Sequence, residues 1–452
     1  MHHKAGLDLG TSNCAIGVVD NGTPSLVELP QHGRFMASTL YAPQAEVIAG
    51  WLHRQLKPHG LERPLEQARG PGLTASLHAL REAKLDGYDE DLAFGQWARD
   101  KYLEDPADCY YIRSHKSFLG GNGLGPRQQQ VFEDITAAML WHLLEQARQS
   151  GQGDLKKVVI GRPINFQGHH AERSNQQAVA IIERAAKLVG IEQMELFYEP
   201  MAAGLTYQQQ LDKPQRVLVV DIGGGTTDVS MLEMGPQLQG DLEKQILGYS
   251  GERTGGNDFD VMLNYHTLMP LLGRGLKDDK GRVIPLKPFL DAASINDLSA
   301  QTRFYSHDTR NQLQALRRQP ELKTLSRLQT LQAEQMTFQQ SAVAEQAKIA
   351  LSQASNHSVA LDYLEPALSA QITQAQFVEA SEGLMTRITQ LIDDTLAQAG
   401  SPADVLFLTG GSANSPFIRE RLEARYGLPM VDGDNFGSVT TGLALWADRI
   451  FQ

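Results

Sequence analysis

Two short glycine-rich segments, each containing an aspartate, stand about half a chain apart in this sequence. The first reads Gly6-Leu-Asp8-Leu-Gly10-Thr11-Ser12-Asn13, and the second reads Val220-Asp221-Ile-Gly223-Gly224-Gly225-Thr226-Thr227-Asp228. Glycines at a tight turn let backbone N–H groups approach phosphate oxygens, and a nearby Asp can organise Mg²⁺ through its water shell. One such segment alone is typical of an ordinary β-hairpin turn. The repetition favours two phosphate-binding loops that face one nucleotide.

Apolar runs on both sides of each glycine loop predict two β-hairpins. We expect strands at Ala5–Leu9 and Ala15–Val19 around the first loop, and at Val217–Asp221 and Asp228–Leu232 around the second. Between the hairpins, apolar spacing predicts helices at Val131–Arg148 and Ala171–Val189, and a buried strand at Val158–Ile160. This alternation of strand and helix favours α/β layers in two similar lobes.

The length of the chain, 452 residues, predicts more than one domain, because single cores rarely grow past about 250–300 residues. We place lobe I at 1–213, lobe II at 214–430 and a C-terminal segment that returns to lobe I at 431–452. Segment 42–116 is rich in Gly, Pro and charge, and we interpret it as an irregular insertion in lobe I. A second insertion, about 271–342, falls within a subdomain of lobe II at about 258–382.

The composition is that of a globular protein, with 41% hydrophobic and 21% charged residues. No apolar run approaches the roughly 18 residues that a membrane span needs, and the N-terminus passes directly into a strand without room for a secretory leader. We therefore expect a cytoplasmic protein, in which Cys14 and Cys109 are reduced. The net charge of −12 argues against contact with nucleic acid or anionic lipid and leaves small ligands or protein partners.

Two further groups of residues suggest binding but have ordinary explanations. Arg317, Arg318, Lys323 and Arg327 could form an anionic docking face, although charge runs are usually solvated faces. The pairs His2-His3 and His169-His170 have no acidic or thiol partners at a known ligand spacing, so surface histidines are favoured over a metal site.

Five separated segments, in the same order, resemble the ATPase domain of the seventy-kilodalton heat-shock chaperones, the DnaK family. They are the two glycine loops, Lys116-Ser-Phe-Leu-Gly120, Tyr198-Glu199-Pro200-Met-Ala-Ala-Gly204 and Thr409-Gly410-Gly411-Ser412-Ala-Asn414-Ser-Pro416. A sixth, weaker match is Ala344-Glu345-Gln-Ala-Lys348-Ile-Ala-Leu-Ser352, and Gly161-Arg-Pro-Ile-Asn-Phe-Gln167 adds similarity to free-standing bacterial YegD-type relatives. The resemblance implies an α/β protein with the actin-like ATPase fold, in which two ribonuclease-H-like lobes with inserted subdomains surround a nucleotide cleft.

The resemblance also implies a role for each polar residue of these segments in ATP hydrolysis, where a protein contributes mainly positioning and electrostatics. Asp8 and Asp221 would hold Mg²⁺ through water, and Lys116 would balance charge near the γ-phosphate. Glu199, Asp228 and Thr226 would orient the attacking water. The expected phosphate contacts are Gly10, Thr11, Ser12, Asn13, Gly223, Gly224, Gly225 and Thr226. For each residue alone an ordinary explanation is favoured: a surface lysine for Lys116, a strand-end cap for Glu199 and a turn residue for Asp228.

For the adenosine, the resemblance implies contacts from Gly256, Glu345, Lys348, Ser352, Gly410, Gly411, Ser412 and Asn414. Glu345, Lys348 and Ser352 share one helical face, which is also the pattern of an exposed polar stripe. Family members usually have arginine where this chain has Asn414, and some have another where it has Ile349. Cation stacking on adenine, worth about 0.5–2 kcal/mol, is therefore not expected.

The resemblance favours a slow Mg²⁺-dependent ATPase with a chaperone-like role, a monomer whose lobes close on ATP and reopen on ADP to control a protein partner. The last expected helix, about Ser438–Ile450, lies near the end of the sequence, so we expect no peptide-binding domain. A small-molecule kinase of the same superfamily is an alternative, but it needs an additional Asp base that the motifs do not contain. A second alternative is an actin-like filament or scaffold protein, in which the insertion at about 271–342 would be the interaction element.

Overall fold

A computed structural model describes residues 3–88, 92–106, 109–166, 171–236, 245–433 and 437–451. The chain forms two compact units. Unit 1 consists of Met1–Arg253, Gln390–Ala413 and Glu423–Gln452, and unit 2 consists of Thr254–Thr389 and Asn414–Leu422. The lobe boundaries expected from the sequence stay a prediction. Within the described part of the chain, no helix is long and apolar enough to cross a membrane.

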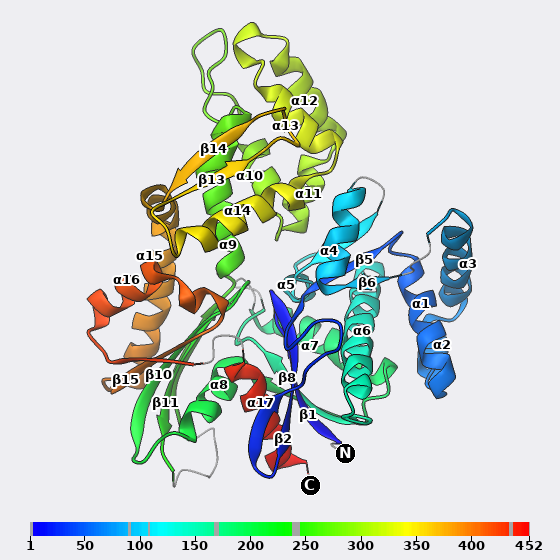
Figure 1. The fold of residues 1–452 in the computed structure, drawn as a ribbon, viewed down its shortest axis with the longest axis vertical. Helices are drawn as coiled ribbons and strands as arrows, with labels where there is room; N and C mark the ends of the chain where they lie inside the picture. Colours follow the sequence, from blue (N-terminus) through cyan, green and yellow to red (C-terminus); the bar gives the residue numbers. More distant parts are fainter. Residues whose placement is uncertain are drawn as a thin grey trace. The chain divides into compact units, whose positions relative to one another are not determined.

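Unit 1 contains two large sheets with the same strand order (Figure 1). The first is β3-β2-β1-β8-β9, with the short β4 beside β2, and the second is β12-β11-β10-β15-β16. In each sheet the first two strands of the chain form an antiparallel hairpin. The last two strands of the sheet, β8 and β9 or β15 and β16, add in parallel beside the first strand of that hairpin. The bounds in the first sheet are β1 Lys4–Leu9, β2 Asn13–Asp20, β3 Thr23–Leu26, β4 Met36–Ala37, β8 Lys157–Arg162 and β9 Gln193–Tyr198. In the second they are β10 Gln215–Ile222, β11 Thr227–Met234, β12 Ile246–Glu252, β15 Val405–Thr409 and β16 Met430–Asp432.

The central strands are apolar on both faces because helices cover both sides of each sheet. Val217, Leu218, Val219 and Val220 of β10 are all fully buried. Among the covering helices are α6 Pro126–Gln149, α7 Ala171–Leu188, α8 Glu199–Gln208 and α17 Ser438–Ile450. These elements confirm the predicted hairpins, the strand at Val158–Ile160 and the two predicted helices between them.

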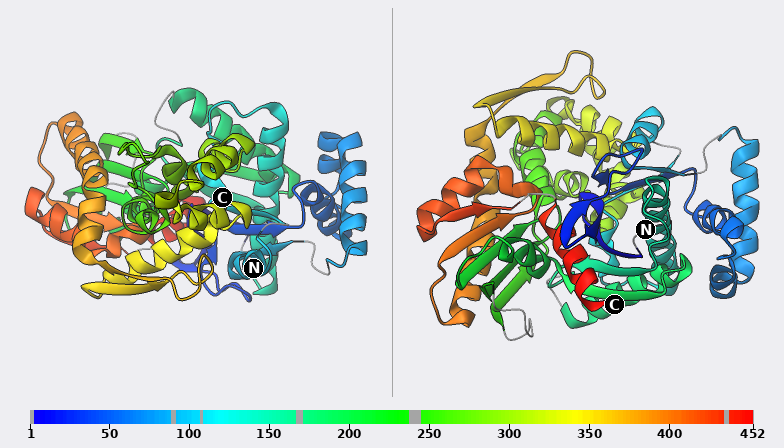
Figure 2. Two further views of the ribbon diagram at one scale, coloured as in Figure 1. Left: turned by 90° about the horizontal axis from the view of Figure 1, so that it is seen from above. Right: turned by 60° about the horizontal axis from the view of Figure 1, so that its bottom comes forward.

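Helix α17 brings the C-terminal part of the chain onto the first sheet. It packs on β1, β2, β8 and α8, and Figures 1 and 2 show it (red) beside the first hairpin (blue). The packing is close: a Cβ on Gly6 would lie 2.3 Å from the backbone N of Ala444, and a Cβ on Gly442 would lie 1.8 Å from the carbonyl O of Ala202. Only glycine fits at these two contacts, so the first fixes α17 against β1, which leads to the first glycine loop, and the second fixes it against α8.

The expectation that segment 42–116 is irregular is wrong. The described residues of this segment form a small sheet, β6-β5-β7, four α-helices and the start of a fifth. The bounds are β5 Thr39–Ala42, α1 Val47–Leu56, α2 Arg63–Arg69, α3 Pro71–Leu85, β6 Ala93–Phe94, α4 Gly95–Glu104, β7 Tyr110–Arg113 and α5 Lys116–Leu119. Pro64 and Pro71 occupy first helical turns, and Gly60 and Gly70 end helical turns with positive φ. Gly and Pro therefore mark helix boundaries in this segment.

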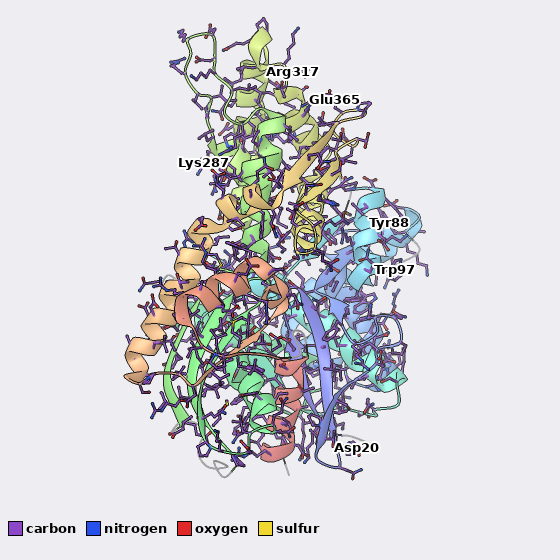
Figure 3. The ribbon with its side chains drawn as sticks, turned by 60° about the vertical axis from the view of Figure 1, so that its left-hand side comes forward. Asp20, Tyr88, Trp97, Lys287, Arg317 and Glu365 are labelled. Atoms are coloured by element: carbon purple, nitrogen blue, oxygen red, sulfur yellow. The ribbon has the colours of Figure 1, made fainter. Side chains whose placement is uncertain are left out.

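Unit 2 is mainly helical, and the segment at about 271–342 contributes several of its helices. Its elements are α9 Gly256–Leu263, α10 Lys287–Ala293, α11 Leu298–Phe304, α12 His307–Arg317, α13 Leu325–Ala333, α14 Thr337–Leu351, β13 Asn356–Ala360 and β14 Ser369–Thr373. Helix α15 Gln374–Ala399 belongs to both units, and α16 is Pro416–Tyr426. Figure 3 labels Arg317 on α12 and Glu365 between β13 and β14. Glu365 binds Arg327 at 2.7 Å and Arg317 donates to Gln329 at 3.0 Å, so these two basic residues of the suggested docking face make contacts within the fold.

Candidate functional site

The two glycine loops meet each other within unit 1. The first loop joins β1 to β2, and the second joins β10 to β11. A Cβ on Gly224 would lie only 2.0 Å from Ser12 Oγ, and a Cβ on Gly225 would lie 2.7 Å from Thr11 Cγ2. The absence of side chains at Gly224 and Gly225 therefore allows the loops to approach, so the backbone N–H groups of both loops are close together.

Lys116 and Glu199 form a buried ion pair beside these loops. Lys116 begins α5 and Glu199 begins α8, and the exposed fractions of the two residues are 5% and 8%. Burial lowers the pKa of Lys116, but the charges of Glu199 and Asp8 outweigh this effect and raise it overall. Lys116 is therefore a fixed ammonium in the interior, and the surface-lysine alternative is wrong.

Three aspartates lie close enough to this ion pair for its charges to shift their pKa values. Burial and the charge of Glu199 raise the pKa of Asp8 to about 7, and the same two causes raise the pKa of Asp228 to about 7. Burial and neighbouring carboxylates raise the pKa of Asp221 well above its usual range. Lys116 lowers the pKa of all three. The cluster thus holds four carboxyl groups around one ammonium.

Asp228 is held in place by backbone contacts. Its Oδ1 accepts a hydrogen bond from the N–H of Ile164 at 2.7 Å, and Thr226 adds a side-chain hydrogen bond. A Cβ on Gly251 would lie 2.5 Å from the same Oδ1, so the β12 strand approaches the carboxylate closely. Asp228 is therefore fixed by tertiary contacts and not only by its own turn.

The Gly410-Gly411 turn lies against the end of the second hairpin. Gly410 has φ +89°, and a Cβ there would lie 2.4 Å from the carbonyl O of Ile222 and 2.6 Å from Asp221 Oδ1. Any other residue at position 410 would clash with Ile222 and Asp221 and would have to adopt a positive φ, so the position requires glycine. Gly411 and Ser412 follow in a short 3₁₀ turn, Gly411–Asn414, and Asn414 is exposed.

The charge of this cluster fits a divalent cation held through water. An excess of buried carboxylates with raised pKa values is relieved by an added positive charge. Among the described residues no group of three or more His, Cys, Asp or Glu side chains could ligate a metal directly. Mg²⁺ commonly keeps several of its waters and is bound through one or two carboxylates together with phosphates. Asp8 and Asp221 fit that requirement.

The residues expected at the adenosine belong mostly to unit 2. Lys348 of α14 binds Asp260 of α9 at 2.7 Å and donates to the carbonyl O of Gly256 at 3.0 Å. Ser352 follows α14 and its Oγ donates to the carbonyl O of Lys348 at 3.3 Å. Gly256, Lys348 and Ser352 are therefore brought together. Glu345 and Lys348 are partly buried, which is not the pattern of a fully exposed stripe, whereas Ile349 is exposed by 59%.

Sequence reasoning did not identify several residues that support the cluster. These are Ser38, Ser114, His115, Ser117 and the backbone N–H of Ile164. Ser117 and Ile164 lie within segments that carried the resemblance, so the sequence could have indicated them, whereas Ser38 and His115 lie outside those segments.

Of the histidines considered for metal binding, His3 is exposed, whereas His2, His169 and His170 lie outside the described residues. Cys14 and Cys109 are free thiols.

The structure contains two equivalent sheets, and the first hairpin of each sheet carries a glycine loop. Both loops lie beside the same cluster of buried carboxylates. This arrangement defines an actin-like ATPase fold. The family model described as Hsp70 protein matches residues 125–278 and 318–448, more than half of the chain. The chain therefore belongs to the Hsp70 family, which confirms the resemblance and the expected fold class.

Individual relatives are distant in sequence but similar over most of this chain. The chaperone protein DnaK of Deinococcus radiodurans is 26% identical over 434 residues, which cover 93% of this chain and 55% of that protein. The chaperone protein DnaK of Thermus thermophilus is 26% identical over 435 residues, which cover 93% of this chain and 56% of that protein. The chain thus spans about half the length of the curated relatives that it matches.

Proposed function

We propose that this chain binds Mg²⁺ and ATP at the two glycine loops and hydrolyses the nucleotide slowly. One observation carries the proposal: two glycine loops that touch, with the buried Lys116–Glu199 pair and three aspartates around them. Membership of the Hsp70 family, whose members are ATPases, supports the same activity.

Each polar group of the cluster can take one part of the reaction. The N–H groups of the two loops, with Thr11, Ser12 and Asn13, would bind phosphate oxygens, and Asp8 and Asp221 would hold the cation through water. When bound, Mg²⁺ would neutralise phosphate charge. Lys116 would stabilise the charge of the transferred phosphate, and Glu199, Asp228 and Thr226 would orient the attacking water.

The adenosine contacts are part of the same proposal. Gly256, Glu345, Lys348 and Ser352, with Gly410, Gly411, Ser412 and Asn414, would contact the ribose and base. Because Lys348 already binds Asp260, its amine would serve mainly to fix the Gly256 backbone and the α14 face. The exposed Ile349 and the amide of Asn414 provide no cation for the adenine ring, so we expect weaker nucleotide binding than an arginine would give.

The proposed output is a chaperone-like switch in which the nucleotide state changes affinity for a protein partner. The similarity to proteins named as chaperones supports a protein partner, and a cytoplasmic monomer remains the expectation from the sequence. We expect no role in binding nucleic acid or membranes, because the net charge is −12.

Calorimetric titration with Mg·ATP and Mg·ADP, followed by pull-downs in each nucleotide, tests this function. We expect saturable binding of both nucleotides and at least one protein captured in only one nucleotide state. Absence of binding at millimolar nucleotide would contradict the proposal. ATP turnover that rises many-fold with an added sugar would instead indicate a small-molecule kinase, and ATP-dependent light scattering would indicate a filament.

A further inference from the structure

Ser38 connects the first glycine loop to the segment that carries Lys116. Its backbone N–H donates to the carbonyl O of Ser12 at 2.9 Å, and its carbonyl O accepts from the N–H of Ser114 at 2.8 Å. Ser12 belongs to the first glycine loop, and Ser114 stands two residues before Lys116. The single residue Ser38 therefore joins two parts of the proposed phosphate site.

The side chain of Ser38 adds a contact to His115, the residue directly before Lys116. Ser38 Oγ and His115 Nδ1 lie 3.4 Å apart, and the two residues are exposed by only 1% and 2%. Ser38 also contacts the Cys14 thiol, at the start of β2. Burial and the charge of Lys116 lower the pKa of His115 to about 4, so the ring is neutral at neutral pH and adds no charge beside the ammonium.

Two further observations set His115 apart from an ordinary core histidine. Its Nε2 atom is buried and has no hydrogen-bond partner among the described residues, which is unfavourable for folding. The preceding residue, Ser114, has φ +60°, a left-handed conformation that costs energy for a residue other than glycine. Such costs cluster at functional sites, where the surrounding structure fixes the strained backbone.

Other contacts hold the remainder of α5. Gln177 Nε2 of α7 donates to the carbonyl O of Leu119 at 2.8 Å and to that of Gly121 at 3.1 Å. Ser117 faces the second glycine loop, because a Cβ on Gly225 would lie 2.9 Å from Ser117 Oγ. Helix α5 is therefore anchored to α7 at its end and to the two loops at its beginning.

We propose that Ser38 and His115 are positioning residues that hold the Lys116 ammonium against Glu199 and beside both glycine loops. Ser38 fixes the distance between the first loop and α5, and the His115 ring fills the buried space before Lys116 while keeping its polar contact to Ser38. The inference rests on the proposed function, since the role of Lys116 in hydrolysis gives this positioning its purpose.

Three variants separate the polar contact from the packing. His115→Phe keeps a buried ring without its nitrogens, His115→Asn keeps a polar atom near the place of Nδ1, and Ser38→Ala removes only the hydroxyl. The matched control is His142→Phe, which replaces a partly buried imidazole that bonds His32 at 2.8 Å and stacks on Phe94. Thermal unfolding is recorded for every variant. If His115→Phe does not fold properly, the Ser38→Ala variant still tests the positioning proposal.

The first readout is single-turnover ATP hydrolysis together with the dissociation constant for Mg·ADP. Because small displacements of a catalytic group are costly, we expect His115→Phe to slow hydrolysis at least ~10-fold and Ser38→Ala to slow it ~3-fold or more. The dissociation constant should change less than about threefold, and His115→Asn should recover most of the rate. His142→Phe should hydrolyse at the wild-type rate.

The second readout is acylation of the Lys116 amine in the ligand-free protein, followed by mass spectrometry at several pH values. A looser contact with Glu199 lowers the pKa of the amine, so we expect His115→Phe to raise the labelling rate at least ~3-fold while His142→Phe does not. If His115 had only a structural role, its replacement would lower the unfolding temperature and leave labelling unchanged.

Folded variants with wild-type hydrolysis and labelling would overturn the inference, even if the ATPase itself is confirmed. A wild type that neither binds nor hydrolyses ATP, with labelling still shifted in His115→Phe, would refute the proposed function and leave the positioning intact.

Discussion

The Lys116 ammonium and the Glu199 carboxylate form an ion pair between residues 83 positions apart, and both are almost completely buried. The pair joins the start of α5 to the start of α8. Lys116 also lowers the pKa of Asp8, Asp221 and Asp228, so one ammonium partly compensates several carboxylates. This arrangement leaves the cluster with an excess of negative charge that a cation can neutralise.

Removal of Lys116 should destabilise the protein because it leaves Glu199 buried without its partner. We expect Lys116→Met to cost about 3–5 kcal/mol of unfolding free energy, and the double variant Lys116→Met/Glu199→Gln to recover much of that loss. Equilibrium unfolding in denaturant measures both. The control is Lys156→Met, which breaks an exposed pair with Glu192 and should change stability little. Equal losses in the single and the double variant would contradict the buried-pair account.

Substitution of Gly224 should separate the two glycine loops. The added Cβ of Gly224→Ala would lie 2.0 Å from Ser12 Oγ, 3.1 Å from Ser12 Cβ and 3.2 Å from Ser12 N. Rotation of the Ser12 hydroxyl would relieve only the first contact, so we expect the loops to move apart. A displacement of this size is expected to slow ATP hydrolysis on the order of 100-fold, measured in single turnover. Gly383→Ala is the control, because its Cβ would meet nothing within 4 Å. A Gly224→Ala protein with wild-type turnover would show that close approach of the loops is not needed.

Binding of Mg·ADP should release protons near neutral pH. The pKa of Asp8 is about 7 in the ligand-free protein, and a cation favours its charged form, so affinity should rise as the pH increases from 6 to 8. Calorimetry in two buffers of different ionisation enthalpy counts the protons, and Asp8→Asn should reduce their number. A wild-type affinity independent of pH, with no protons released, is incompatible with this model.

The same raised pKa has a consequence for stability without ligand. Because the pKa of Asp8 rises from 3.8 in the unfolded chain to about 7 in the folded protein, its contribution to stability is fully present below about pH 4. That contribution is lost as the pH increases through 7. We therefore expect Asp8→Asn to flatten this part of the stability profile.

An arginine at position 414 should strengthen nucleotide binding. Asn414 is exposed at the end of the Gly411–Asn414 turn, and an arginine there could stack on adenine. Stacking of about 0.5–2 kcal/mol corresponds to an affinity gain of about 2- to 30-fold for Mg·ADP, which calorimetry measures. Asn414→Lys, which keeps the charge without the planar group, should gain less. If Asn414→Arg does not raise the affinity for Mg·ADP, the adenine ring does not bind next to position 414.

The sequence was sufficient to predict the elements that carry glycine loops, because local chemistry determines them. Asp8 and Asp221 lie near the ends of the apolar strands β1 and β10, the glycines follow directly, and both hairpins form as expected. The helix at Ser438–Ile450 is likewise confirmed. These features depend on residues adjacent in the chain.

Features that depend on distant contacts could not be predicted in the same way. The expectation of an irregular insertion at 42–116 is wrong because Pro64 and Pro71 can begin a helix as well as interrupt one, and only packing decides between the two. Ser38 and His115 carry no pattern in the sequence, and their proximity arises from the pairing of β5 with β7. The hydrogen bond from the Ile164 N–H to Asp228 is equally a product of tertiary structure.

The most direct test of the central claim is single-turnover hydrolysis of ATP, in the presence of Mg²⁺, by the wild type and by Lys116→Ala. The account predicts slow phosphate release by the wild type and release at least ~100-fold slower in Lys116→Ala, with Mg·ADP still bound by both proteins. A wild type that does not bind ATP at millimolar concentration, or a Lys116→Ala variant that hydrolyses ATP at the wild-type rate, would contradict it.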